Sequence, residues 1–121
     1  MNIMIVGIGL DLIELYRIKK SIQKSNRLVT RILTQKERNV FEELTSTRRQ
    51  VEFLAGRFAA KEAFAKATGR GIGKLSFQHI EILSRANGKP ELTAQGYEDV
   101  RIFISITHSK DYAAAQVIIE E

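Results

Sequence analysis

The sequence predicts an α+β fold in which an antiparallel sheet packs around one long, buried helix. The helix is predicted from residues 53–68, a stretch dominated by Phe, Leu and Ala that contains only four charged side chains. The sheet is predicted from the last third of the chain, where polar and apolar residues alternate, and from the apolar run at residues 3–10. At 121 residues, the chain is expected to form a single domain over residues 1–121.

The first predicted element is a strand over residues 3–10, an uninterrupted apolar run typical of a strand buried on both faces. Gly7 and Gly9 do not form a dinucleotide-binding fingerprint, because the position that needs a third glycine is Leu12. We interpret these glycines as positions where another backbone or a ligand approaches the strand closely. Asp11 follows the run, and it either caps the next helix or ligates a metal at the carboxyl end of the strand.

Helical periodicity replaces the apolar run over residues 12–27. Leu15, Ile18 and Ile22 are three and four residues apart and form a core-facing stripe. A second stripe with the same spacing is basic, and no acidic residue interrupts it after Glu14. The members of this basic stripe are Arg17, Lys20, Lys24 and Arg27. It is either a solvated helix face or a docking surface for an acidic partner.

Capping signals mark the helices in the middle of the chain. Residues 34–37 match a capping box, which predicts a helix that ends near Thr45. Residues 47–50 form a second box, which predicts the start of the long helix, and Gly69 is expected to cap its C-terminus. The basic, glycine-rich stretch 69–74 either wraps a phosphate or simply turns the chain.

The four charged residues of the long helix are placed unusually. On a helical wheel, Arg57 and Lys61 fall in a narrow gap between two apolar arcs, and Glu62 and Lys66 lie just past one edge. An unpaired ion costs several kcal/mol when it is buried. Glu62 and Lys66 can pair with each other, but this leaves Arg57 and Lys61 without a partner. Three cations and one carboxylate on a buried helix therefore favour an anionic ligand held together with a metal.

The last third of the chain is predicted to be mainly β structure. A strand over residues 77–83 leads into residues 86–89, which contain the Asn-Gly turn signal. A short helix is predicted over residues 93–100. Residues 101–109 alternate cleanly and predict a strand, and a turn then leads to a final strand over residues 112–119.

His108 lies where a predicted strand enters a turn. A single histidine at such a position is most often structural, but Thr107, Ser109 and Lys110 surround this one. Hydroxyls, an imidazole and an ammonium that converge on one turn can form a phosphate pocket. His79 has no comparable neighbours, and we assign it no role.

Composition limits the classes of function. The formal net charge of +5 favours anionic partners, namely nucleic acid, phosphorylated small molecules or an acidic protein. Aromatic residues make up only 7% of the chain and Trp is absent, which disfavours stacking platforms for single-stranded nucleic acid. There is no cysteine, no apolar run long enough to span a membrane and no secretion signal. We therefore expect a cytoplasmic protein with no membrane partner.

Four segments together resemble holo-acyl-carrier-protein synthase, the short bacterial type of 4′-phosphopantetheinyl transferase. The matching segments are Gly7–Asp11 with Glu14 and Arg17, Gly56–Ala63, Asn87–Pro90, and Ser105–Ser109. They occur in the family's order over essentially the whole chain. Thr107 stands where relatives often have Ser, which keeps the hydroxyl.

The resemblance implies a Mg²⁺-dependent enzyme that moves phosphopantetheine from coenzyme A to a serine of acyl carrier protein, releases 3′,5′-ADP and supports fatty acid biosynthesis. By motif position, Asp11 and Glu62 are the expected metal ligands, and Glu62 and Lys66 the expected catalytic residues. Lys66 is expected to hold a diphosphate oxygen. The base that deprotonates the serine is either Glu62 or a water on the metal. The family also implies a homotrimer with active sites between subunits.

The resemblance implies further contacts with both substrates. Arg57 and His108 are the expected ligands of the 3′-phosphate of coenzyme A, with Thr107 or Ser109 assisting. Lys61 belongs to the motif, and it either contacts phosphate with the coenzyme A-binding residues or pairs with an acidic side chain in the core. The basic stripe from Arg17 to Arg27 becomes the expected docking face for the acidic carrier protein.

The alternative is a non-catalytic basic module that binds nucleic-acid phosphates. It explains the net charge but not the carboxylates of Asp11 and Glu62, which would repel a phosphate backbone in the absence of a metal. The sequence therefore favours an enzyme without a nucleic-acid partner.

Overall fold

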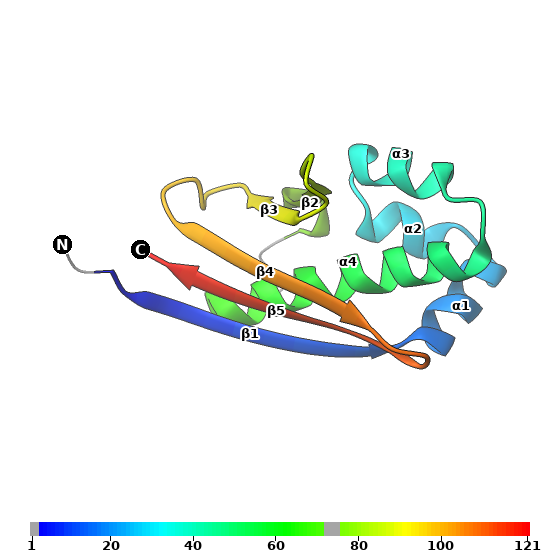
Figure 1. Ribbon diagram of the computed structural model, residues 1–121, viewed down its shortest axis with the longest axis horizontal. Coiled ribbons are helices and arrows are strands. Elements are labelled where there is room, and N and C mark those ends of the chain that lie inside the picture. Colours follow the sequence, from blue (N-terminus) through cyan, green and yellow to red (C-terminus); the bar gives the residue numbers. More distant parts are fainter. Residues whose placement is uncertain (1–2, 72–75) are drawn as a thin grey trace.

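A computed structural model describes residues 3–71 and 76–121 (Figure 1). Residues 72–75, which belong to the basic, glycine-rich stretch, lie outside the described residues. The elements in chain order are β1 (Ile5–Glu14), α1 (Leu15–Lys24), α2 (Arg27–Ile32), α3 (Gln35–Glu43), α4 (Thr47–Thr68), the 3-10 turn η1 (Phe77–His79), β2 (Ile80–Ser84), β3 (Pro90–Ala94), β4 (Arg101–His108) and β5 (Tyr112–Glu120).

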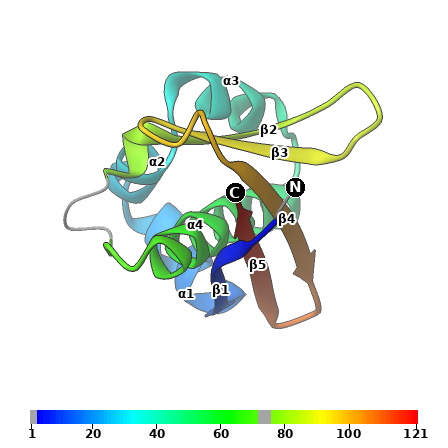
Figure 2. The same cartoon turned by 90° about the vertical axis from the view of Figure 1, so that its left-hand side faces the viewer.

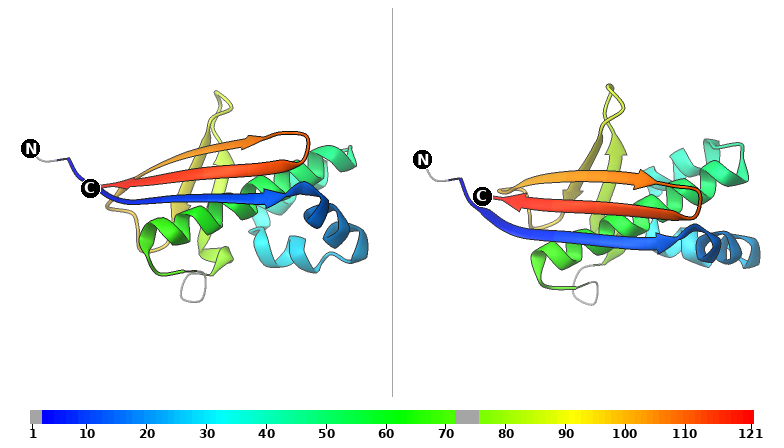
Figure 3. Two further views of the ribbon diagram at one scale, coloured as in Figure 1. Left: turned by 90° about the horizontal axis from the view of Figure 1, so that it is seen from below. Right: turned by 60° about the horizontal axis from the view of Figure 1, so that its bottom comes forward.

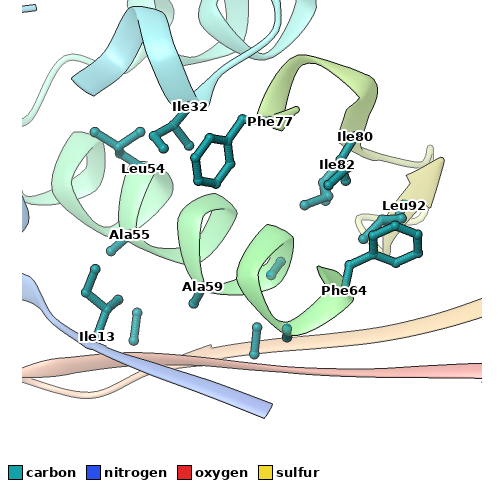
Figure 4. Close-up of a cluster of buried hydrophobic side chains, with 14 of the residues drawn as sticks. Ile13, Ile32, Leu54, Ala55, Ala59, Phe64, Phe77, Ile80, Ile82 and Leu92 are labelled. Carbon is teal, nitrogen blue, oxygen red and sulfur yellow. The ribbon is translucent and has the colours of Figure 1, made fainter. Parts of the chain in front are cut away.

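The long helix α4 lies between two antiparallel sheets. The larger sheet has the strand order β1-β5-β4, and the smaller one is the β2-β3 hairpin on the opposite side of α4 (Figures 1 and 2). Helices α1, α2 and α3 gather around the N-terminal half of α4. Buried apolar side chains from all these layers meet on α4, and Figure 4 shows Leu54, Ala59 and Phe64 within this cluster. The predicted fold class is confirmed.

The backbone of α4 packs directly on β1 through the two glycines of that strand. A Cβ atom on Gly7 would lie 2.0 Å from the carbonyl oxygen of Ala67, and a Cβ on Gly9 would lie 1.8 Å from that of Ala63. No side chain fits in either space, so the approach requires glycine. The predicted close approach is confirmed, and the approaching group is the helix backbone.

Strand β1 differs from the prediction in length and in burial. It continues to Glu14, because its pairing with β5 extends to Glu14 opposite Tyr112. Asp11 therefore lies within the strand and does not cap a helix. The prediction that both faces are buried is wrong, since the outward side chains Leu10 and Leu12 are 62% and 63% exposed. Only the face towards α4 is covered.

The capping signals were largely correct. Thr34 and Glu37 form the predicted capping box at the start of α3. Gly69 caps α4 in the left-handed conformation, with φ of 76°. The N-cap of α4 is Ser46 and not Thr47, because the Ser46 hydroxyl accepts the Arg49 N–H. The helix predicted over residues 12–27 is shorter: residues 12–14 belong to β1, α1 ends at Lys24, and Arg27 begins the separate helix α2.

The short helix predicted over residues 93–100 is wrong. The Asn-Gly turn reverses the chain into β3, and Leu92 of β3 pairs with Ile82 of β2. Gly96 then adopts a φ of 87°, a left-handed conformation that a helix does not accommodate. The predicted strand over residues 77–83 begins as the turn η1 and becomes regular only at Ile80.

Candidate active site

Two acidic residues and one lysine meet where β1 crosses the C-terminal half of α4. Asp11 points from β1 towards the helix that carries Glu62 and Lys66. The Lys66 Nζ atom lies 3.0 Å from Asp11 Oδ1 and also donates to the Leu10 carbonyl at 3.1 Å. Among the described residues Lys66 forms no ion pair with Glu62, so the expected pairing within the helix is replaced by pairing across to β1.

The electrostatics of Glu62 indicate a crowded anionic site. Desolvation by burial, and then repulsion from the Asp11 carboxylate, raise the pKa of Glu62. Lys66 and Arg31 act in the opposite direction on the same pKa. Two carboxylates that repel each other in this way are a natural place for a divalent cation, whose charge removes the repulsion.

The donor set fits Mg²⁺ better than a transition metal. Both side chains offer hard oxygen atoms, and the described residues contain no cluster of three or more His, Cys, Asp or Glu side chains that could form a protein cage. Mg²⁺ is commonly held by one or two carboxylates, with water and substrate phosphates filling the remaining positions. Asp11 and Glu62 would supply those two carboxylates.

Lys61 is completely buried and is not available to a ligand. Its Nζ atom lies 2.6 Å from Glu37 Oε1, 2.7 Å from the Ile32 carbonyl oxygen and 3.1 Å from the Phe77 carbonyl oxygen. All three ammonium hydrogens therefore have acceptors inside the protein. The expected contact between Lys61 and coenzyme A is corrected to the other alternative, an ion pair in the core, and the partner Glu37 was not found from the sequence.

Arg57 is half-buried, and at least one of its hydrogen-bond donors has no partner among the described residues. Its guanidinium carbon lies 4.0 Å from the centroid of the Phe53 ring, so the group is held by a cation–π contact. The buried Nε atom of Arg57 has no hydrogen-bond partner in the described part of the chain. Burial lowers the pKa of this guanidinium, and Glu37 opposes that effect. A held cation with an unused donor is suited to binding an anion.

His108 lies at the other end of α4. Its Nδ1 atom is 3.2 Å from Glu52 Oε2, and the same oxygen accepts a hydrogen bond from Arg48 Nε at 2.9 Å. Arg48 also donates to the carbonyl oxygens of Ser109 and Lys110, which ties the β4–β5 turn to the start of α4. Neither Glu52 nor Arg48 was singled out in the sequence, because their partners at the end of β4 and in the β4–β5 turn are more than fifty residues away.

The expected site residues therefore form two separate groups in one chain. Glu52, which contacts His108, precedes Glu62 by ten residues on α4, a rise of about 15 Å along the helix. Thr107 is exposed on the outer side of the sheet, and the Ser109 hydroxyl accepts the Tyr112 N–H within the turn. Figure 1 shows the β4–β5 turn at the N-terminal end of α4, away from the C-terminal half of the helix.

Comparison with known proteins identifies the family. The sequence profile of the 4′-phosphopantetheinyl transferase superfamily matches residues 7–117. The chain belongs to this superfamily. The resemblance seen in the motifs is confirmed, and so is the assignment of an enzyme.

Relatives match the phosphopantetheinyl transferase chain over nearly its whole length. A holo-[acyl-carrier-protein] synthase of Geobacillus sp. (strain WCH70) is 56% identical over 118 residues, which cover 97% of this chain and 98% of the relative. One of Oceanobacillus iheyensis is 52% identical over 97% of this chain and 98% of its own length. The crystal structure of a holo-(acyl-carrier-protein) synthase from Bacillus anthracis in complex with CoA (3′,5′-ADP) has a TM-score of 0.88, with 50% identity and 98% coverage of both chains.

The surface of α1 and α2 carries a basic groove. The four residues of the basic stripe are exposed on α1 and at the start of α2. Beside them lies a shallow groove of about 290 Å³ with no acidic residue in its lining. The groove is lined by Ser21, Lys24, Ser25, Arg27, Leu28 and Arg31. Arg31 was not predicted, although it continues the basic stripe four residues beyond Arg27.

Proposed function

We propose that this transferase moves the 4′-phosphopantetheine group of coenzyme A to a serine hydroxyl of apo acyl carrier protein. The serine oxygen forms a bond to the phosphorus that carries pantetheine, and the bond from that phosphorus to the bridging diphosphate oxygen breaks. The leaving group is 3′,5′-ADP. The names of the relatives support this reaction, and the ligand named for the Bacillus anthracis structure supports coenzyme A as the donor.

The observation that carries the proposal is the cluster of Asp11, Glu62 and Lys66. A bound Mg²⁺ would supply charge neutralisation at the diphosphate. Asp11 on β1 and Glu62 on α4 would be the residues that hold this ion. The side chain of Lys66 is 55% exposed, and among the described residues it is held by Asp11 and the Leu10 carbonyl alone, so it can turn to a diphosphate oxygen. The raised pKa of Glu62 suits a proton acceptor, and a metal-bound water is the other candidate base.

We propose that the active form is a homotrimer with its sites between subunits. The outer face of the β1-β5-β4 sheet supports this assembly, because no helix crosses it in either view of Figure 3. Ile8, Leu10, Leu12 and Phe103 on this face are each at least half exposed. Several exposed apolar side chains on one face of a sheet mark an interaction surface. A second copy would also contribute Arg57 and His108 to the 3′-phosphate of coenzyme A bound at Asp11 and Glu62, because within one chain His108 lies at the other end of α4 from Glu62.

The carrier protein is proposed to dock on the basic groove and the stripe formed by Arg17, Lys20, Lys24 and Arg27. Positive charge without interleaved acidic residues complements an acidic partner and steers its approach. We place the reaction in the cytoplasm, where it would supply the carrier for fatty acid biosynthesis. No helix among the described residues has the length and apolar character needed to cross a membrane.

The deciding experiment is incubation of apo acyl carrier protein with coenzyme A and the protein, with and without Mg²⁺. Intact-mass measurement of the carrier should show the gain of one phosphopantetheine group only when Mg²⁺ is present. Retention of the unmodified mass in both samples contradicts the proposed reaction. Equal modification in the presence of a chelator contradicts the metal site.

A further inference from the structure

The C-terminal end of α2 is held by two side chains from distant parts of the sequence. The Gln78 amide nitrogen, in η1, lies 3.1, 3.1 and 3.0 Å from the carbonyl oxygens of Thr30, Arg31 and Leu33. The Nζ atom of Lys61, on α4, donates a hydrogen bond of 2.7 Å to the remaining carbonyl oxygen of this run, that of Ile32. All four consecutive carbonyls, residues 30–33, are therefore bound from outside the helix. Because all the partners are carbonyl oxygens, only the donor end of the Gln78 amide can face them.

These contacts decide the position of α2, because α2 is too short to be stable without them. The helix has six residues, and isolated helices of this length do not form in water. The last carbonyls of any helix need partners beyond the helix itself. Next to the cap, the Arg31 guanidinium lies 5.6 Å from the centroid of the Phe77 ring, so η1 contacts α2 through two neighbouring residues.

Helix α2 lines the basic groove and also carries a charge that acts on Glu62. Arg27, Leu28 and Arg31 are on this helix and line the groove. The positive charge of Arg31 also acts against the rise in the pKa of Glu62. A small rotation of α2 would therefore change the shape of the groove and move the charge of Arg31 relative to Glu62.

We propose that Gln78 and Lys61 are positioning residues for carrier-protein binding, which cap α2 and thereby fix Arg31 in the lining of the basic groove. This inference rests on the proposed function, since it assumes that the carrier occupies the groove. Neither residue touches the carrier in this arrangement. Both act through Arg31 and its helix.

Gln78 is the better residue to test, because it is exposed, whereas Lys61 is completely buried and its loss would destabilise the whole fold. Gln78→Met keeps the length of the side chain and removes the donor. We expect the Kd for apo carrier, measured without coenzyme A by fluorescence anisotropy, to rise about fivefold, which corresponds to ~1 kcal/mol. The KM for the carrier should rise equally, and the KM for coenzyme A should stay unchanged.

Gln35→Met is the matched control. The Gln35 amide nitrogen is also exposed and bonds the side chain of Asn39 within α3, at 2.9 Å. The same chemical change at this position should leave the Kd for the carrier at the wild-type value. If Gln78→Met behaves as Gln35→Met does, or lowers only the melting temperature, Gln78 merely stabilises the fold and the inference is overturned.

A double-mutant cycle tests whether Gln78 acts through Arg31. Arg31→Ala should weaken carrier binding by itself, and adding Gln78→Met should then have little further effect. Additive losses, or no effect of Arg31→Ala, overturn the inference while the proposed function survives. If the wild-type protein neither binds nor modifies the carrier, the proposed function fails, and the inference fails with it.

Discussion

Lys61 and Glu37 form a completely buried ion pair, with 2.6 Å between Nζ and Oε1. Glu37 is fully satisfied within this pair, because its Oε1 also accepts the Thr34 N–H and its Oε2 accepts the Ile82 N–H. The pair thus joins α4, α3 and β2 at one point. Lys61 directly precedes Glu62 in the chain, so the same turn of α4 carries a buried structural charge and a candidate metal ligand.

Removal of one member of this pair should be much worse than removal of both. Lys61→Met leaves a buried carboxylate without its cation, and we expect a loss of ~3–5 kcal/mol in the free energy of unfolding. The double variant Lys61→Met with Glu37→Gln removes both charges, and its amide oxygen still accepts a buried N–H, so it should recover most of this loss. Urea denaturation of the two variants checks the expectation. Equal destabilisation by both would mean that the pair contributes more than charge compensation.

Glu62→Gln should abolish transfer while the fold remains intact. The substitution removes a proposed metal ligand and keeps the size of the side chain, so we expect turnover to fall by at least about a hundredfold. Circular dichroism and the melting temperature should remain close to wild type. Near-normal turnover at saturating Mg²⁺ would mean that Glu62 is not a metal ligand.

The rate of transfer should fall on the acid side of neutrality. Burial and the Asp11 carboxylate raise the pKa of Glu62, so this side chain takes up a proton at a higher pH than an exposed glutamate does. Protonated Glu62 neither ligates a cation well nor accepts a proton. The rate should therefore decrease as pH falls through the raised pKa, and more Mg²⁺ should move the decrease to lower pH.

Profiles of kcat/KM against pH at two Mg²⁺ concentrations test this expectation. A profile that does not respond to Mg²⁺ would contradict competition between metal and proton at Glu62.

The raised pKa of Glu62 has the opposite consequence for stability, because low pH favours folding although it slows transfer. A carboxyl group with a raised pKa in the folded state favours folding below its ordinary pKa, and this contribution is lost as pH rises through the raised value.

Gly9→Ala and Gly56→Ala should have very different effects. On Gly9 the new Cβ would lie 1.8 Å from the carbonyl oxygen of Ala63, a backbone atom that cannot move alone, so we expect severe destabilisation. On Gly56 the nearest atom is the side-chain Cγ2 of Ile106 at 3.0 Å, which can shift. There the gain in helix propensity, ~1 kcal/mol, offsets the contact. Thermal denaturation of both variants separates the two cases.

Reversal of charge on the basic stripe should affect one substrate selectively. With Arg17→Glu and Lys24→Glu combined, we expect the KM for the carrier protein to rise at least about tenfold and the KM for coenzyme A to change little. Added salt should weaken carrier binding by the wild type more than by the variant. An equal loss for both substrates would contradict docking on this face.

Local sequence signals predicted those features whose cause is local. The capping box at Thr34, the left-handed Gly69 and the alternating strands follow from neighbouring residues, and the structure contains all of them. The close approach at Gly7 and Gly9 was also predictable, because a missing side chain on an apolar strand implies a close neighbour.

The features that were missed depend on contacts between distant segments. Lys61 and Glu37 are 24 residues apart, and no spacing rule connects them. The segment from Thr93 is extended up to Ala94 because β3 pairs with β2, a partner that local propensity does not include. The outer face of β1 is uncovered because α4 packs on only one side of the sheet. The apolar composition of β1 alone could not distinguish a face that the chain itself covers from a face that it leaves exposed.

Strand β1 carries two different surfaces on alternate residues. Asp11 and the glycines face α4, and Leu10 and Leu12 face outwards. The insertion of a single residue before Asp11 would exchange the two sets, turning the carboxylate to the outside and a leucine against the helix backbone. The number of residues in this strand is thus as strictly determined as their identity, because the proposed metal ligand and the proposed subunit interface depend on the same alternation.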